Sequence, residues 1–213
     1  MKSLWIALTA LAGIIALIAL GTDRLSNRNS YEHDALAASA AEFDLVGAKK
    51  CKTCHMSEKS GAQHTKWLAG PHAKAFLTLA SPVSVAKAKE LGIADPQKAP
   101  QCLKCHATAA PVMADMAKQT ITMEEGVSCE SCHGPGSVYW KKKVMEDVFA
   151  GTLTPESVGL VHPVKEATCV TCHNNTHPFH VEFDFVKYSA DVAHPYPKGF
   201  REAAAATKKV GAK

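Results

Sequence analysis

The stretch Cys129-Glu-Ser-Cys132-His133 decides the fold, because it is one of four copies of the motif Cys-x-x-Cys-His. The four copies use all eight cysteines of the 213-residue chain, so no cysteine is left over. Their members are Cys51, Cys54 and His55; Cys102, Cys105 and His106; Cys129, Cys132 and His133; and Cys169, Cys172 and His173. Four motifs of one pattern predict four sites of one chemical type.

The spacing within each motif suits covalent attachment of heme. Two cysteines three positions apart reach the two vinyl groups of one porphyrin and form thioethers, and a histidine directly after the second cysteine lies under the iron as its proximal ligand. We therefore predict four covalently bound c-type hemes, attached through the eight cysteines. The predicted proximal ligands are His55, His106, His133 and His173.

Three other uses of paired cysteines were weighed: two zinc ribbons, a thiol redox site and four disulfides in an oxidising compartment. None of them needs a histidine after the second cysteine. With 11 histidines in 213 residues, chance places one after a given pair about one time in twenty. A histidine after all four pairs therefore favours covalent heme.

The second axial ligand of each iron must come from elsewhere in the chain. Outside the motifs the histidines are His33, His64, His72, His162, His177, His180 and His194. Methionine is the other common ligand, and apart from the initiator the chain has Met56, Met113, Met116, Met123 and Met145. The surplus of histidine favours irons with two histidine ligands and hence low reduction potentials.

Three of these seven histidines are our main candidates for distal ligands. His72 follows a proline in a helical stretch and His194 precedes a proline at a helix end, so both rings have restricted directions. His162 lies seven residues before the fourth motif, within reach of a neighbouring heme. His177 and His180 are weaker candidates because they follow His173 closely. The last two are weaker still, His64 as a helix-surface residue and His33 as part of a linker.

The composition predicts a mostly α-helical domain with long loops, little β structure and a thin protein core. Hydrophobic residues make up 46% of the chain but aromatic residues only 7%, so four hemes would fill much of the interior. Helices are expected over 67–79, 139–149 and 183–192, and from Ser81-Pro82 to Gly92, where Ser81 caps the helix and Pro82 takes its first position. We expect a loop over 94–101 and one short strand over 120–123.

The apolar run at 4–20 indicates export. Its length lies between that of a signal-peptide core and that of a spanning helix, so residues 1–21 are either a cleaved signal peptide or a membrane anchor. Residues 22–45 are predicted to be a linker, 46–200 the tetraheme domain and 201–213 a flexible basic tail. The folded domain is then periplasmic. A net charge of +4 gives no indication of nucleic-acid binding.

Three segments resemble the tetraheme cytochrome c-554 family, and the resemblance extends over about 46–197. They are Gly47-Ala-Lys-Lys-Cys51-Lys-Thr-Cys54-His55, the run from Trp67 to His72-Ala-Lys-Ala, and Gly126-Val-Ser-Cys129-Glu-Ser-Cys132-His133-Gly134-Pro135-Gly136. The resemblance implies a periplasmic electron carrier with stacked hemes, three with two histidine ligands and one, at the second motif, with an open iron. It also implies that His72 and His194 are distal ligands, whereas His162 lies at a shifted offset. The family histidine after the third motif has no counterpart here.

The leading functional hypothesis is electron transfer in a respiratory chain, without enzymatic activity. The electron donor would be a hydroxylamine-oxidoreductase-like enzyme or a quinol-oxidising complex. An open iron at the second motif would instead allow reduction of a small nitrogen oxide. A third hypothesis is self-association into a heme filament, as in related tetraheme proteins.

Overall fold

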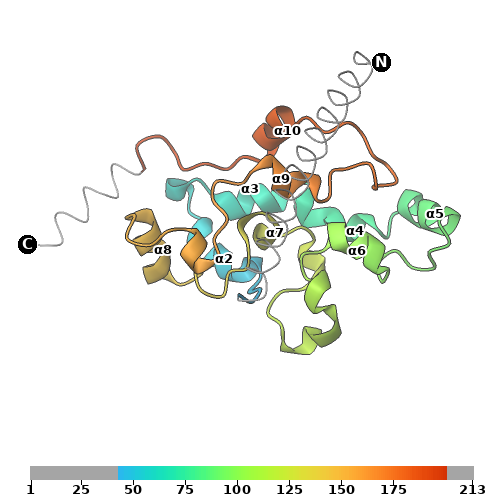
Figure 1. The fold of residues 1–213 in the computed structure, drawn as a ribbon, viewed down its shortest axis with the longest axis horizontal. Helices are drawn as coiled ribbons and strands as arrows, with labels where there is room; N and C mark the ends of the chain where they lie inside the picture. The colour runs from blue at the N-terminus through green and yellow to red at the C-terminus, as the bar shows by residue number, and fades with distance from the viewer. Residues whose placement is uncertain (1–42, 201–213) are drawn as a thin grey trace, which may run out of the picture. The chain divides into compact units, whose positions relative to one another are not determined.

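The computed structural model describes residues 43–200, which form short helices joined by long loops (Figure 1). The α-helices are α2 (Ala48–His55), α3 (Gln63–Ala69), α4 (Ala75–Thr78), α5 (Pro82–Glu90), α6 (Pro100–His106), α7 (Cys129–His133), α8 (Lys142–Phe149), α9 (Glu166–Val170) and α10 (Phe185–Val192). Short 3-10 helices are η1 (Glu58–Ser60), η2 (His72–Lys74), η3 (Ala110–Lys118), η4 (Met123–Glu125) and η5 (Glu156–Val158). This described part is mostly helical, as predicted.

Each motif lies on a helical turn. The first three motifs end α2, α6 and α7, and the fourth begins in α9. Beyond the end of α9 the turn continues through the motif, because the His173 N–H donates to the Cys169 carbonyl at 2.9 Å. Residues at positions i, i+3 and i+4 share one face of a helix. Both thiols and the imidazole of a motif therefore face the same side.

Local signals predicted α5 correctly. The Ser81 hydroxyl accepts a hydrogen bond from the Ser84 N–H at 3.2 Å, and Pro82 takes the first helical position. Gly92 follows the helix with a φ of 72°, a backbone conformation that glycine adopts without strain. The helix and both of its ends are confirmed.

The helix expected over 67–79 is broken in the middle. α3 ends at Ala69, where the Gly70 N–H donates to the Trp67 carbonyl at 2.9 Å. Pro71 then precedes η2, which leads directly into α4. A proline has no N–H and clashes with the preceding turn, so it starts a helix more readily than it continues one.

Two further helices begin later than predicted, and one begins earlier. α8 starts at Lys142 rather than at residue 139, and α10 starts at Phe185 behind Asp184, whose carboxylate accepts from the Lys187 N–H at 3.0 Å. α6 takes the last two residues of the loop expected over 94–101, because Pro100 is its first residue.

The strand expected over 120–123 is wrong, and within residues 43–200 there is no strand. Thr120 Oγ1 donates to the Val46 carbonyl at 2.7 Å, and the Ile121 side chain is fully buried. Met123 already begins η4. The segment is held by a side-chain hydrogen bond and by packing, not by a backbone ladder.

The protein core of this part is thin. Its buried hydrophobic residues are Ala48, Ala62, Ala73, Leu79, Ala88, Ala99, Leu103, Ala107, Ala109, Ile121, Tyr139, Val158 and Leu160. More than half of them are alanine, and the larger side chains form two separate clusters, around Leu103 and around Tyr139. These side chains alone bury little apolar surface, so they contribute little hydrophobic stabilisation to the fold.

Several predicted segments lie outside the described residues: 1–21, most of the linker 22–45, and the tail 201–213. In the part of the chain that the structure describes, no helix has both the length and the apolar character needed to cross a bilayer.

Candidate functional site

The first and third motifs lie against each other. α2 contacts α7, and the thiols of Cys51 and Cys129 lie close enough to influence each other's ionisation. The Cys129 thiol, together with burial, raises the pKa of Cys51, and the Cys51 thiol lowers the pKa of Cys129. Attachment points of two different motifs therefore lie close together.

The fourth motif lies beside both the second and the third. Burial, followed by the neighbouring Cys172 thiol, raises the pKa of Cys105 to about 11. Burial, followed by Cys169 and Cys172, raises the pKa of Cys132 to about 11. These electrostatic influences link the motifs in the order first, third, fourth, second, which differs from their order in the chain.

Three motif histidines face a histidine from another segment. The ring centroids of His173 and His72 are 6.0 Å apart with planes at 63°, and those of His133 and His194 are 6.0 Å apart at 72°. The rings of His106 and His177 are 5.8 Å apart at 21°. Each pair joins a motif to a residue that is distant from it in sequence.

These separations fit a metal ion held between two imidazoles. Two rings that bind one metal through nitrogen atoms at about 2 Å have centroids about 6 Å apart. Rings in direct van der Waals stacking would be closer, like Phe183 on His173 at 4.8 Å. The three pairs are therefore spaced as axial ligands of heme iron would be.

Backbone carbonyls orient several of these rings. Nδ1 of His106 lies 2.9 Å from the Ala75 carbonyl, and Nδ1 of His194 lies 2.8 Å from the Val192 carbonyl. A carbonyl only accepts, so Nδ1 carries the proton and Nε2 keeps the lone pair that binds a metal. His133 has a longer contact of the same kind, 3.3 Å to the Val161 carbonyl.

Burial also favours the neutral, metal-binding form of the imidazole. It lowers the pKa of His72, of His133 and of His173 below the ordinary value of 6.5. Neighbouring histidines add a smaller effect in the same direction for His72 and His133.

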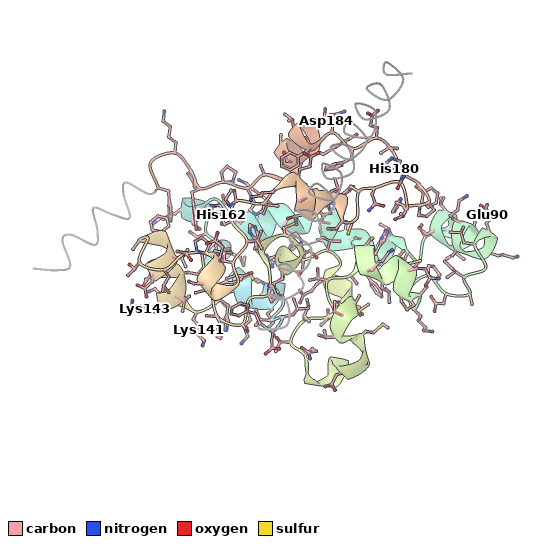
Figure 2. All side chains as sticks on the ribbon, in the orientation of Figure 1. Glu90, Lys141, Lys143, His162, His180 and Asp184 are labelled. Carbon is pink, nitrogen blue, oxygen red and sulfur yellow. The ribbon has the colours of Figure 1, made fainter. Side chains whose placement is uncertain are left out.

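The first motif has a different environment. Nδ1 of His55 lies 3.4 Å from Gln63 Oε1, and within residues 43–200 no second histidine faces its ring at the spacing of the three pairs. His64 is near enough for His55 to contribute to lowering its pKa, after burial and Lys52, but its ring packs edge-on against Trp67 at 5.2 Å. His162 is exposed on the loop before α9 (Figure 2).

One of the paired residues is a stronger candidate than its sequence position indicates. His177 follows His173 closely, which makes it a weak candidate by sequence, yet it faces His106 of the second motif. Nothing in its spacing from the fourth motif indicates this partner, because the contact depends on the second and fourth motifs meeting in space.

Glu130, which lies between the two cysteines of the third motif, has a buried carboxylate that the sequence pattern does not indicate. The residue is 4% exposed, and its carboxylate accepts hydrogen bonds from the N–H groups of Val46 at 2.9 Å, Gly47 at 2.7 Å and Gly136 at 2.6 Å. A Cβ at Gly136 would lie 3.0 Å from Glu130 Oε1 and 2.8 Å from the Val46 side chain, so the site requires glycine. Glu130 thereby joins the start of α2 to α7.

The pH dependence of Glu130 is testable. Burial raises its pKa above the ordinary 4.5, and the three backbone donors only partly oppose this. A carboxyl group with a raised pKa stabilises the fold fully below its unfolded pKa and loses that contribution as the pH rises through the folded pKa. We therefore expect the free energy of unfolding of the native protein to fall relative to that of Glu130→Gln as the pH rises from about 4 to about 7.

Denaturant titrations of both proteins across this pH range measure that difference. Both proteins contain the same histidines, so the effect of histidine titration on the free energy of unfolding cancels in the difference. Glu125, whose pKa burial also raises and Glu130 raises further, acts in the same direction, because removing the Glu130 charge eases its ionisation. If the free energy of unfolding of the native protein instead rises relative to that of Glu130→Gln as the pH rises, the three donors outweigh burial in setting the pKa of Glu130.

The alternative uses of the cysteines have no matching geometry here. All eight cysteines are free thiols. Among the described residues, no group of three or more histidine, cysteine, aspartate or glutamate side chains is arranged to hold a bare metal ion.

Cys-x-x-Cys-His motifs on helical turns, with their histidines facing other histidines at metal-bridging distance, are typical of c-type cytochromes. These are electron-transfer proteins that carry heme through covalent bonds to cysteine. The comparisons with known proteins agree with this class. Residues 50–134, which include the first three motifs, match the family model described as cytochrome c554 and c-prime.

The chain is also 35% identical over 105 residues to cytochrome c-554 of Nitrosomonas europaea. This match covers 46% of the chain and 41% of the relative, so it spans less than half of either protein. No solved structure matches the chain. Over residues 50–134 the chain is thus similar to the cytochrome c554 and c-prime family, in agreement with the resemblance found in the sequence.

Proposed function

We propose that the chain is a tetraheme c-type cytochrome that transfers electrons between redox partners of a respiratory chain. The observation that supports this best is the spacing of the three histidine pairs, whose ring centroids lie 5.8 to 6.0 Å apart and join each of three motifs to a distant segment. Heme, when bound, supplies iron that gains and loses one electron. Four such sites in contact within one domain form a continuous path for electrons.

The residues of the chain hold and orient the cofactor in this proposal. The eight cysteines form the thioethers, and His55, His106, His133 and His173 are the proximal ligands. His72 and His194, at 6.0 Å from their partner rings, are distal ligands at the fourth and third motifs. His162 stays the third predicted distal ligand. Histidine in place of methionine as second ligand gives low reduction potentials.

The segment just after the second motif also borders the third motif, because Thr108 Oγ1 lies 2.5 Å from Ser131 Oγ. The proposed path therefore has more than one connection between its sites. The chain needs no catalytic nucleophile or base for this role.

Location and partners belong to the same proposal. The apolar run at 4–20 directs the chain to the periplasm, free or tethered to the inner membrane. The donor would be a hydroxylamine-oxidoreductase-like enzyme or a quinol-oxidising complex. The basic cluster 141–143 is a weak docking site, because Lys142 pairs with Glu146 at 3.8 Å and Lys143 with Asp147 at 2.5 Å within α8.

We expect four hemes per chain and four electrons taken up on full reduction. The protein would be produced in a host that attaches c-type heme, its heme quantified per chain, and peptides mapped for heme at each cysteine pair. A reductive titration followed by visible absorbance counts the electrons. Fewer than four hemes, or hemes that do not exchange electrons with one another, would contradict the tetraheme carrier.

A further inference from the structure

We propose that His177 is the distal ligand of the iron at the second motif, so that this iron has two histidine ligands and no open position. The inference rests on the proposed function, because it presumes heme at Cys102 and Cys105. Its basis is the His106–His177 pair, with ring centroids 5.8 Å apart and planes at 21°. Of the three facing pairs in the described part of the chain, these two rings are the nearest to parallel.

The contact between the second and fourth motifs explains how His177 reaches this position. The Cys172 thiol lies near enough to the Cys105 thiol to raise its pKa, and His177 follows Cys172 by five residues. A residue just after the fourth motif therefore lies beside the second motif. The ring of His106 is oriented by a hydrogen bond from its Nδ1 to the Ala75 carbonyl at 2.9 Å.

A hydrogen-bonded turn lies between His177 and its own motif. The Asn174 side-chain amide donates to the Val170 carbonyl at 2.8 Å, and its oxygen accepts from the Thr176 N–H at 2.9 Å. The His177 N–H donates to the Asn174 carbonyl at 3.2 Å. His173 faces a different ring, that of His72. The two histidines, four positions apart, thus serve different irons.

His177 is held less firmly than His106. The Phe179 N–H donates to Nδ1 of His177 at 3.1 Å, which places the proton of the neutral ring on Nε2. Binding a metal through Nε2 moves that proton to Nδ1 and gives up this hydrogen bond. His177 is therefore the weaker of the two ligands, while the ring stays in place through the Asn174 turn.

This ligation differs from the open iron that the family resemblance implies for the second motif. An iron with two histidine ligands stays low-spin and offers no free position to a small molecule. It favours electron transfer over reduction of a nitrogen oxide.

The test compares His177→Ala with His180→Ala in the heme-loaded full-length protein. His180 is a matched control, because it is an exposed histidine on the same loop (Figure 2). We expect His177→Ala to keep four hemes but to show one more high-spin heme per chain than the native protein in the EPR spectrum of the oxidised state. Added imidazole should restore the low-spin signal, and His180→Ala should match the native spectrum.

An unchanged high-spin content in His177→Ala, or the same gain in His180→Ala, would overturn the assignment. If His177→Ala does not mature, His177→Met provides a second test, since methionine keeps a ligand and raises the potential of one heme; an unchanged redox titration then overturns the assignment. A native heme count below four would contradict the proposed function instead. Peptide mapping shows whether heme is attached at Cys102 and Cys105. It therefore distinguishes a failure of the His177 assignment from a failure of the proposed function.

Discussion

Replacing Glu130 by alanine is expected to lower the free energy of unfolding of the heme-loaded protein by about 3 kcal/mol or more. The carboxylate is the shared acceptor of the Val46, Gly47 and Gly136 N–H groups, at distances of 2.6 to 2.9 Å. Each buried donor left without a partner costs about 1–3 kcal/mol, and removal of the buried charge recovers only part of the total.

The functional consequence follows from what Glu130 joins. Val46 and Gly47 directly precede α2, which carries the first motif, and Glu130 lies in α7, which carries the third. Loosening this link would separate α2 from α7, the two helices in contact that carry these motifs. Heme at the first motif would then exchange electrons with the rest of the path more slowly.

Chemical denaturation followed by heme absorbance and circular dichroism measures the change in stability. Glu124→Ala is the matched control, because Glu124 is an exposed carboxylate six residues earlier, on η4. We expect this control to stay within about 0.5 kcal/mol of the native protein. A similarly small effect at Glu130 would show that water replaces the carboxylate as acceptor.

Features with a local cause could be predicted from the sequence. The Ser81-Pro82 start of α5 acts within one helical turn, so the residues themselves fix it. In contrast, 120–123 has the residues of a strand but lies beside no other strand, and a β-strand needs a partner that the sequence pattern does not supply.

Features that depend on segments meeting in space were harder to predict. His72 and His194 could be ranked because neighbouring prolines restrict their rings. His177 could not, because its partner is set by the contact between the second and fourth motifs. Glu130 was missed for a related reason: a carboxylate between two cysteines is ordinarily exposed, and its three donors come from two other segments.

Without heme, the chain is expected not to fold. More than half of the buried hydrophobic residues in the described part are alanine, and the larger side chains occur in two small clusters rather than one core. An alanine buries little more than a methyl group, which contributes about 0.8 kcal/mol, whereas ordering the backbone costs about 1–2 kcal/mol per residue. The spaces between the paired histidines would also be left unfilled.

The full-length chain produced in a host without heme-attachment machinery provides the comparison with the heme-loaded protein. We expect the heme-loaded protein to unfold in one cooperative transition, and the heme-free chain to show no transition in denaturant and weak helical circular dichroism. A sharp transition in the heme-free chain would mean that the two clusters and the Glu130 link suffice to hold the fold. The paired histidines would then be positioned before heme arrives, and the cysteines would present a preformed site. The absence of a transition would mean instead that heme attachment brings the four motifs together, so that ligand pairing and folding are one event.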